Sequence, residues 1–258
     1  MLQKLALSFP CLVCFFWAIT LSIRWKKNLR TQNIWAVASF LAAINAFYWM
    51  RLYTPGLEVH SYTGMVISFT NLGFYCVLYL FYFSLIDHRP FNWKHYLILA
   101  PAVAHGTVNN ALIFIIGKEE LEAFMNALTA NNWMPPEDMS FLLTVHYYLG
   151  SLIGILTGLL LINLLLILIL VRVVAYRDKR KDFFPPAPNS SRRQSWAILF
   201  GLSILLVGML CFLMGDFLYS IENYIPFPVL FALQGILFFF LGYHVYFLEK
   251  PTPNARPI

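Results

Sequence analysis

The chain contains few charged residues. They make up 12% of its 258 residues, whereas a soluble domain has about 25%. Hydrophobic residues make up 60% of the chain, and they are grouped into long runs. The composition therefore excludes an ordinary soluble globular domain and indicates an integral membrane protein.

Cysteine is also scarce, and its positions do not suggest disulfides. The four cysteines, Cys11, Cys14, Cys76 and Cys211, all fall inside apolar runs, which argues against a disulfide framework. Cys11 and Cys14 share a helix face, but no histidine or carboxylate stands beside them. We expect these side chains to pack against neighbouring helices, and we expect no metal ion or other cofactor.

The sequence lacks the common catalytic patterns. It contains neither H-E-x-x-H nor G-x-S-x-G. Acid–base catalysis by paired carboxylates is not expected either, because Asp216 is the only acidic residue in the apolar runs. The last run has no lysine that could anchor retinal. We therefore expect no catalytic residue and no enzymatic activity.

Seven apolar runs are long enough to cross a bilayer, which takes about 20 residues as a helix. They do not alternate with the period of two that membrane β-barrels require. The sequence thus predicts an all-α, polytopic bundle of seven transmembrane helices over residues 1–250, followed by a polar tail or the start of a linker at 251–258. The predicted spans are about 5–24, 34–52, 64–86, 95–116, 142–172, 196–219 and 226–247.

Lysine and arginine are distributed unevenly among the connections between these runs. All but three of the 18 lie in alternate connections, beginning with "RWKKNLR" after the first run; the exceptions are Lys4, Arg51 and Lys118. Positive side chains remain in the cytoplasm, so we expect the amino terminus outside and the carboxyl terminus in the cytoplasm. The net charge of +6 is explained by this topology and by attraction to anionic lipid, and it does not indicate direct contact with nucleic acid.

The predicted outer connection 117–141 contains a one-sided apolar stripe. Leu121, Phe124, Met125 and Leu128 recur at helical spacing, and three glutamates stand in the first turn, where the helix dipole favours them. The pattern predicts an amphipathic helix at about 119–129. Two interpretations are open: a helix lying on lipid headgroups, or a lid over a pocket.

Polar side chains inside the spans are concentrated, on this orientation, between the midplane and the outer surface. Asn163 and His244 are the exceptions and lie toward the cytoplasm. Unpaired polar groups are costly in hydrocarbon, so we expect these side chains to face inward, either as interhelical hydrogen bonds or as a polar pocket open to the outside. Arg51 and Asp216 are candidates for an ion pair. The candidate ligand-binding residues are Asn45, Asn71, His105, Asn109, Asn110, His146, Asp216 and Gln234.

Several stretches resemble a known arrangement. They are "KKNLRTQNIWAVASFLAAINAFYW", "VLYLFYFSLIDHRPFNWKHYLILAPAVAH", "RVVAYRDKRKDFFPPAPNSSRRQSWAILF" and "FFFLGYHVYF". Together they resemble the seven-helix membrane half of AraC-type regulators common in Bacteroidetes, in which a cytoplasmic helix-turn-helix domain follows the bundle. The resemblance implies a sensor in the bacterial inner membrane. The residues that would bind DNA are not in this sequence, so the chain is either the membrane portion of a longer protein or a stand-alone relative.

Three functions fit these features. The first is a sensor or signalling module that binds a small molecule or lipid in an outward-facing polar pocket and acts on a cytoplasmic regulator or within a homo-oligomer. The second is a carrier or lipid-handling protein, which would need a polar path through Asn163 and His244. The third is a structural or assembly subunit whose polar residues hold its helices together.

Overall fold

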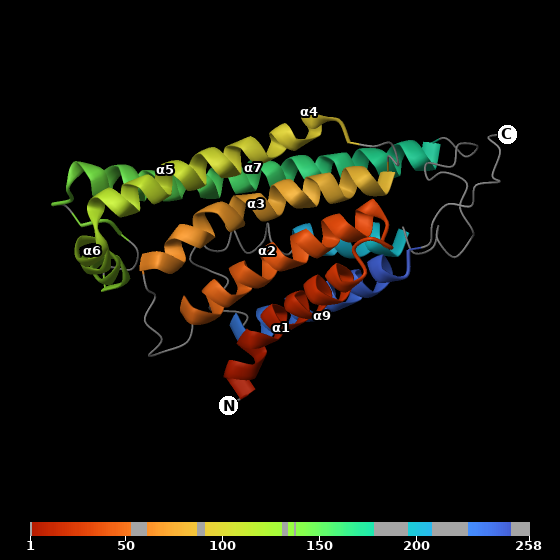
Figure 1. Ribbon diagram of the computed structural model, residues 1–258, viewed down its shortest axis with the longest axis horizontal. Coiled ribbons are helices and arrows are strands. Elements are labelled where there is room, and N and C mark those ends of the chain that lie inside the picture. The colour runs from red at the N-terminus through yellow and green to blue at the C-terminus, as the bar shows by residue number, and fades with distance from the viewer. Residues whose placement is uncertain are drawn as a thin grey trace.

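The computed structural model describes residues 2–52, 61–86, 91–130, 134–136, 138–177, 196–207 and 227–248. These residues form helices joined by turns, and no strand occurs among them. The helices are α1 (Leu2–Ile23), α2 (Arg30–Leu52), α3 (Ser61–Ile86), α4 (Trp93–Tyr96), the 3-10 turn η1 (Leu97–Leu99), α5 (Ala100–Ile116), α6 (Lys118–Ala130), α7 (Phe141–Arg177), a short helix at Trp196–Val207, and α9 (Phe227–Tyr246) (Figure 1).

Six of the described helical segments are long and apolar enough to cross a membrane. They correspond to the first five and the last of the predicted spans. The span predicted at 196–219 is described only as the apolar helix Trp196–Val207, and its remainder lies outside the described residues. An all-helical bundle of membrane-spanning type is thus confirmed, while the seventh span and the orientation of the termini stay predictions.

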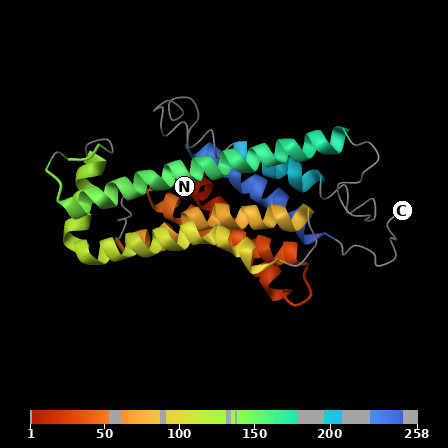
Figure 2. The ribbon, with the colours of Figure 1, turned by 90° about the horizontal axis from the view of Figure 1, so that it is seen from above.

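Helix α3 lies between two groups of helices. On one side α2 packs against it and in turn contacts α1 and α9, and on the other side α5 and α7 contact both α3 and each other (Figure 1). Figure 2 shows α6 at one end of the molecule, where α5 leads into it. We call this the α6 end. The opposite end carries the α1–α2 turn with Arg24, Lys26 and Lys27, and we call it the basic end.

The centre of the first group is an aromatic core around Trp35. This side chain on α2 is fully buried, and its ring centroid lies 4.9 Å from that of Phe81 on α3 and 5.9 Å from that of Phe238 on α9. Offset and tilted aromatic pairs of this kind add to the stability gained by burial. They hold α2, α3 and α9 together near the basic end.

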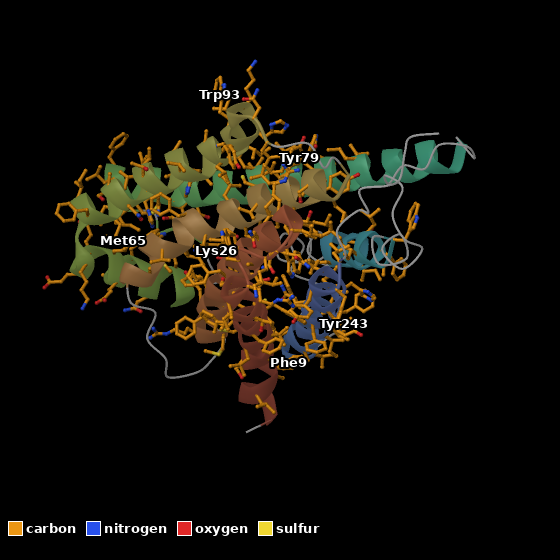
Figure 3. All side chains as sticks on the ribbon, turned by 45° about the vertical axis from the view of Figure 1, so that its right-hand side comes forward. Phe9, Lys26, Met65, Tyr79, Trp93 and Tyr243 are labelled. Carbon is orange, nitrogen blue, oxygen red and sulfur yellow. The ribbon has the colours of Figure 1, made fainter. Side chains whose placement is uncertain are left out.

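Glycines allow α1 and α9 to pack closely. A side chain at Gly235 would collide with Phe9, and a side chain at Gly242 would collide with Trp17. These glycines are seven residues apart, about two helical turns, so both lie on the face of α9 that meets α1 (Figure 3 labels Phe9). Small residues at such contacts are typical of packing between membrane helices.

The fourth predicted span, 95–116, is not a single α-helix. Helix α4 passes through the 3-10 turn Leu97–Leu99 before α5 begins. Pro101 stands in the first turn of α5, where its missing N–H costs nothing, whereas its ring would clash with the carbonyl of Leu97 in a continuous α-helix. Trp93 at the start of α4 is exposed and projects from the bundle (Figure 3).

Candidate functional site

A buried polar group lies where α3, α5 and α7 meet. His105 on α5 places its Nδ1 3.2 Å from the carbonyl oxygen of Ser68 on α3. The Ser68 hydroxyl in turn lies 3.0 Å from Oδ1 of Asn110 and 2.7 Å from the carbonyl oxygen of Met65. Ser68, His105 and Asn110 thus form a connected network between two helices. With Asn109 and His146, described next, we call them the histidine group.

Helix α5 presents this network because its buried residues form one stripe. Ala102, His105, Gly106, Asn109 and Ile113 are buried at helical spacing, so the polar side chains face the bundle and not the surrounding lipid. His105 is 8% exposed and Asn109 is 7% exposed. The prediction that these two side chains face inward is confirmed.

Helix α7 contributes the second histidine of the group. The His146 imidazole lies close enough to His105 for the two rings to interact electrostatically, and the backbone carbonyl of Leu149 also approaches the His105 ring. Neither His105 Nε2 nor His146 Nδ1 has a hydrogen-bond partner, although both atoms are shielded from solvent. Buried polar atoms normally have partners. Other exceptions in the described part of the chain include Trp35 Nε1 and Tyr82 Oη, and the two histidine nitrogens lie on helices α5 and α7, which contact each other.

Helix α6 covers the end of the bundle next to the histidine group. Leu121, Phe124 and Leu128 are buried against Ile113 and Leu143 of α5 and α7. The Phe124 ring centroid lies 6.5 Å from that of His146, edge to face. The predicted amphipathic helix is confirmed, and its apolar stripe packs on other helices of this chain, which is the arrangement the lid interpretation requires.

Two polar contacts at the surface also involve α6. The Ser140 hydroxyl donates to Oε1 of Glu120 over 3.0 Å, which joins α6 to the residue just before α7. Lys118 and Glu122 form an exposed ion pair one helical turn apart, at 3.7 Å. Both contacts are at the surface, so burial of the apolar stripe contributes more to holding α6 in place than they do.

Asn45 was nominated for the same pocket, but it lies on the other side of α3. Its Nδ2 donates to the carbonyl oxygen of Thr70 at 3.2 Å, and the Thr70 hydroxyl donates to Asn45 Oδ1 at 2.7 Å. Thr70 is two residues from Ser68, so the two side chains leave α3 in nearly opposite directions. Asn45 is therefore satisfied by a helix–helix contact with α3.

Three further candidate residues are Asn71, Gln234 and Asp216. Asn71 on α3 is half-buried, and Gln234 is half-buried on α9, a helix that packs against α1 and α2. Asp216 lies outside the described residues, and with it the predicted Arg51–Asp216 ion pair. Arg51 is described, and its guanidinium carbon lies 5.9 Å from the ring centroid of Phe47. Of the described candidates, Asn45 and Gln234 therefore lie apart from the histidine group.

The polar path required of a carrier is also incomplete where the structure describes it. Asn163 on α7 was expected to be buried, but it is exposed. Its position on a helix face that also carries exposed Leu159, Ile162 and Leu166 explains this. His244 is half-buried and packs edge to face on Phe240, with ring centroids 4.5 Å apart.

Two important polar residues were not predicted. Ser68 links His105 and Asn110, but serine in a membrane helix usually bonds its own backbone and so gives no signal in the sequence. Gln32 at the start of α2 is 6% exposed, and its amide lies at the end of α9. The sequence feature that could have indicated this role is a glutamine in the first turn of a helix, directly after the basic segment 24–30.

The side chains of the histidine group are polar groups without a carboxylate, lysine or arginine among them. They are imidazoles, carboxamides and a hydroxyl, and in the described part of the chain no three His, Cys, Asp or Glu side chains are grouped so as to hold a metal ion. No protein-family model, curated protein or solved structure matches the chain.

Proposed function

We propose that the protein is an integral membrane sensor that binds a small molecule or lipid at the histidine group and passes the signal to the basic end. In this proposal the α6 end faces outside and the basic end faces the cytoplasm, as the distribution of Lys and Arg predicts. The membrane is the bacterial inner membrane, and the recipient of the signal is a cytoplasmic regulator.

The observation that carries the proposal is the contrast between two polar contacts of α3. Asn45 and Thr70 satisfy each other with two hydrogen bonds, as expected where polar residues only join helices. His105 and His146 each retain a buried nitrogen without a partner, and the Phe124 ring of α6 packs against His146. A site that binds a ligand leaves such atoms unpaired until the ligand arrives.

A route for the signal is provided by long elements that reach both ends. Helix α7 runs without interruption for 37 residues, from the histidine group to the basic end. Helix α3 contacts both helix groups. A ligand shifts such a bundle only if it binds one helix arrangement better than another, so contacts shared by α3, α5 and α7 are where that preference would act.

The resemblance to the membrane half of AraC-type regulators agrees with this function. In that arrangement the last helix leads into the cytoplasmic domain. Here the last described turn of α9 is held by Gln32 of α2, which donates to the carbonyl oxygens of Val245, Tyr246 and Leu248 at 3.1, 2.9 and 3.3 Å. A displacement of α2 would therefore move the end of α9.

The test is a ligand-dependent thermal shift of the purified protein in lipid nanodiscs. A set of uncharged metabolites and lipids is screened on the wild-type chain, and each hit is repeated on His105→Leu, Asn109→Leu and Thr107→Val. Thr107 is an exposed residue of the same helix and is the matched control. We expect the shift to be lost in the first two variants and kept in the third; an unchanged shift in all three would reject the site.

An assembly subunit is the second candidate, because α7 exposes a regular apolar stripe. Its members recur alternately at three and four residues, the spacing of left-handed helix packing, and Asn163 is exposed beside them. Isolation of the chain with a stoichiometric partner that is lost in Asn163→Leu would favour this function. The stripe is formed by Leu152, Ile155, Leu159, Ile162 and Leu166.

A further inference from the structure

The protonation of His105 can be read from its neighbours. Its Nδ1 lies 3.2 Å from the carbonyl oxygen of Ser68. A carbonyl oxygen can only accept a hydrogen bond, so Nδ1 carries the hydrogen. In an uncharged imidazole the other nitrogen, Nε2, is then an acceptor with a free lone pair.

Among the residues that the structure describes, no acidic side chain is buried beside His105. Glu119, Glu120 and Asp138 are exposed, and Glu122 pairs with Lys118. A buried cation without a counter-charge is costly in a membrane interior. The uncharged form, with Nε2 as an acceptor, is therefore the state that fits these surroundings.

The nitrogen Nε2 is buried and has no partner. Other buried atoms without a partner in the described part of the chain include Trp35 Nε1 and Tyr82 Oη, but these carry a hydrogen, whereas Nε2 of this tautomer is an acceptor. His105 is 8% exposed, and no described residue satisfies Nε2. The carbonyl oxygen of Leu149 also approaches this ring, but no hydrogen bond joins it to Nε2, and a carbonyl cannot supply a hydrogen to an unprotonated nitrogen. The missing component is thus a hydrogen-bond donor.

The surroundings define the rest of the molecule that would supply this donor. Phe124 of α6 stands edge-on to His146, and Ile113 and Leu143 are buried in the apolar cluster that includes Phe124. On α3, the Phe69 ring occupies the space beside Gly106. These neighbours are apolar, so a ligand held among them would have an apolar body, and the acceptor atoms disfavour an anion.

We infer that the histidine group binds an uncharged amphiphile whose aliphatic hydroxyl donates a hydrogen bond to His105 Nε2. This inference rests on the proposed function, because it names the chemical class of ligand for the same site. The hydroxyl could belong to a small free alcohol or to a neutral lipid such as a diacylglycerol, and the experiment below distinguishes these sources.

The first measurement needs no variant. The protein is labelled with 15N-histidine and studied in phosphatidylcholine nanodiscs. The His105 signals are assigned as those lost in His105→Leu. If His105→Leu does not fold, the His146 signals are assigned with His146→Phe and those of His105 by elimination. We expect an Nδ1–H tautomer with an unprotonated Nε2. Hexan-1-ol should move the Nε2 signal, whereas its isomer methyl pentyl ether, which lacks a donor, should not.

The second measurement compares the sources of the hydroxyl. Saturating hexan-1-ol, or dioleoylglycerol added to the nanodisc lipid, should raise the Tm by about 2–4 °C, and methyl pentyl ether should not. Thr107→Val should respond as the wild type does. A rise with either alcohol supports the inference and identifies the source, whereas an Nε2–H tautomer, or equal effects of alcohol and ether, overturns it.

Hydrogen exchange at residues 24–32 separates this inference from the proposed function. If the alcohol binds His105 and exchange at the basic end is unchanged, the site stands and the signalling function fails. If hexan-1-ol and dioleoylglycerol have no effect but a ligand without a hydroxyl changes exchange at the basic end, the inference fails and the signalling function stands.

Discussion

Gln32 Nε2 lies 2.9 Å from the carbonyl oxygen of Tyr246, and this hydrogen bond joins the start of α2 to the end of α9. The last carbonyls of a helix have no partner within that helix, and a buried glutamine supplies donors for them here. The contact is reinforced by Arg24, whose Nη1 donates to the Tyr246 hydroxyl at 2.6 Å. These contacts tie the α1–α2 turn to the last helix.

Replacement of Gln32 by leucine should therefore destabilise the bundle. The carbonyl oxygens at the end of α9 would lose a buried donor, and the cost expected for buried groups left unsatisfied is about 1–3 kcal/mol. Thermal unfolding in nanodiscs measures this loss. Lys27→Ala, an exposed change in the same turn, should have little effect; equal effects of the two variants would show that the Gln32 contact is unimportant.

The Asn45–Thr70 contact should behave as helix-to-helix bonding and nothing more. A double-mutant cycle with Asn45→Leu and Thr70→Val should give a coupling of about 0.6 kcal/mol, with an upper limit near about 2 kcal/mol. Neither variant should alter the response to hexan-1-ol. Loss of that response in Asn45→Leu would place Asn45 in the ligand site after all.

Gly106 should not tolerate even one added carbon. A Cβ at this position would lie only 2.2–2.5 Å from three ring carbons of Phe69, and overpacking of this kind costs about 1–3 kcal/mol. Gly150→Ala is the matched control, because a Cβ at Gly150 meets nothing within 4 Å. Thermal unfolding should show Gly106→Ala destabilised and Gly150→Ala unaffected, and Phe69→Leu should partly restore the stability of Gly106→Ala.

The predicted orientation is tested by chemical labelling in intact cells. With the native cysteines replaced by alanine, a cysteine at position 118 should react with a membrane-impermeant maleimide added outside. A cysteine at position 26 should react only after the membrane is permeabilised. The reverse result would place the amino terminus in the cytoplasm and would move the histidine group to the inner leaflet.

Much of the fold could be predicted from sequence because hydropathy and length determine which segments can span a membrane. Helix α6 could be predicted from the helical spacing of Leu121, Phe124 and Leu128, because this periodicity indicates which face of a helix is buried. The 3-10 turn before α5 was missed, although Pro101 indicated a local break.

The candidate site could be predicted only in part. The inward direction of His105 and Asn109 followed from the cost of exposing them to lipid. The separation of Asn45 from His105 and Asn109 could not be predicted. Helices α2 and α5 contact different faces of α3, and which faces they contact depends on how the helices are rotated about their axes. The role of Ser68 was likewise hidden, since a hydroxyl within a helix gives no sign of a partner on another helix.

The central claim, that the histidine group beneath α6 is a ligand site, is tested most directly by photolabelling. An aliphatic alcohol that carries a diazirine is irradiated with the protein in nanodiscs, and the labelled residues are mapped by mass spectrometry. We predict saturable labelling near His105, Phe124 and His146 that hexan-1-ol displaces and His105→Leu abolishes. Labelling that never saturates and falls only on lipid-facing residues such as Val108 and Ile155 would contradict the account.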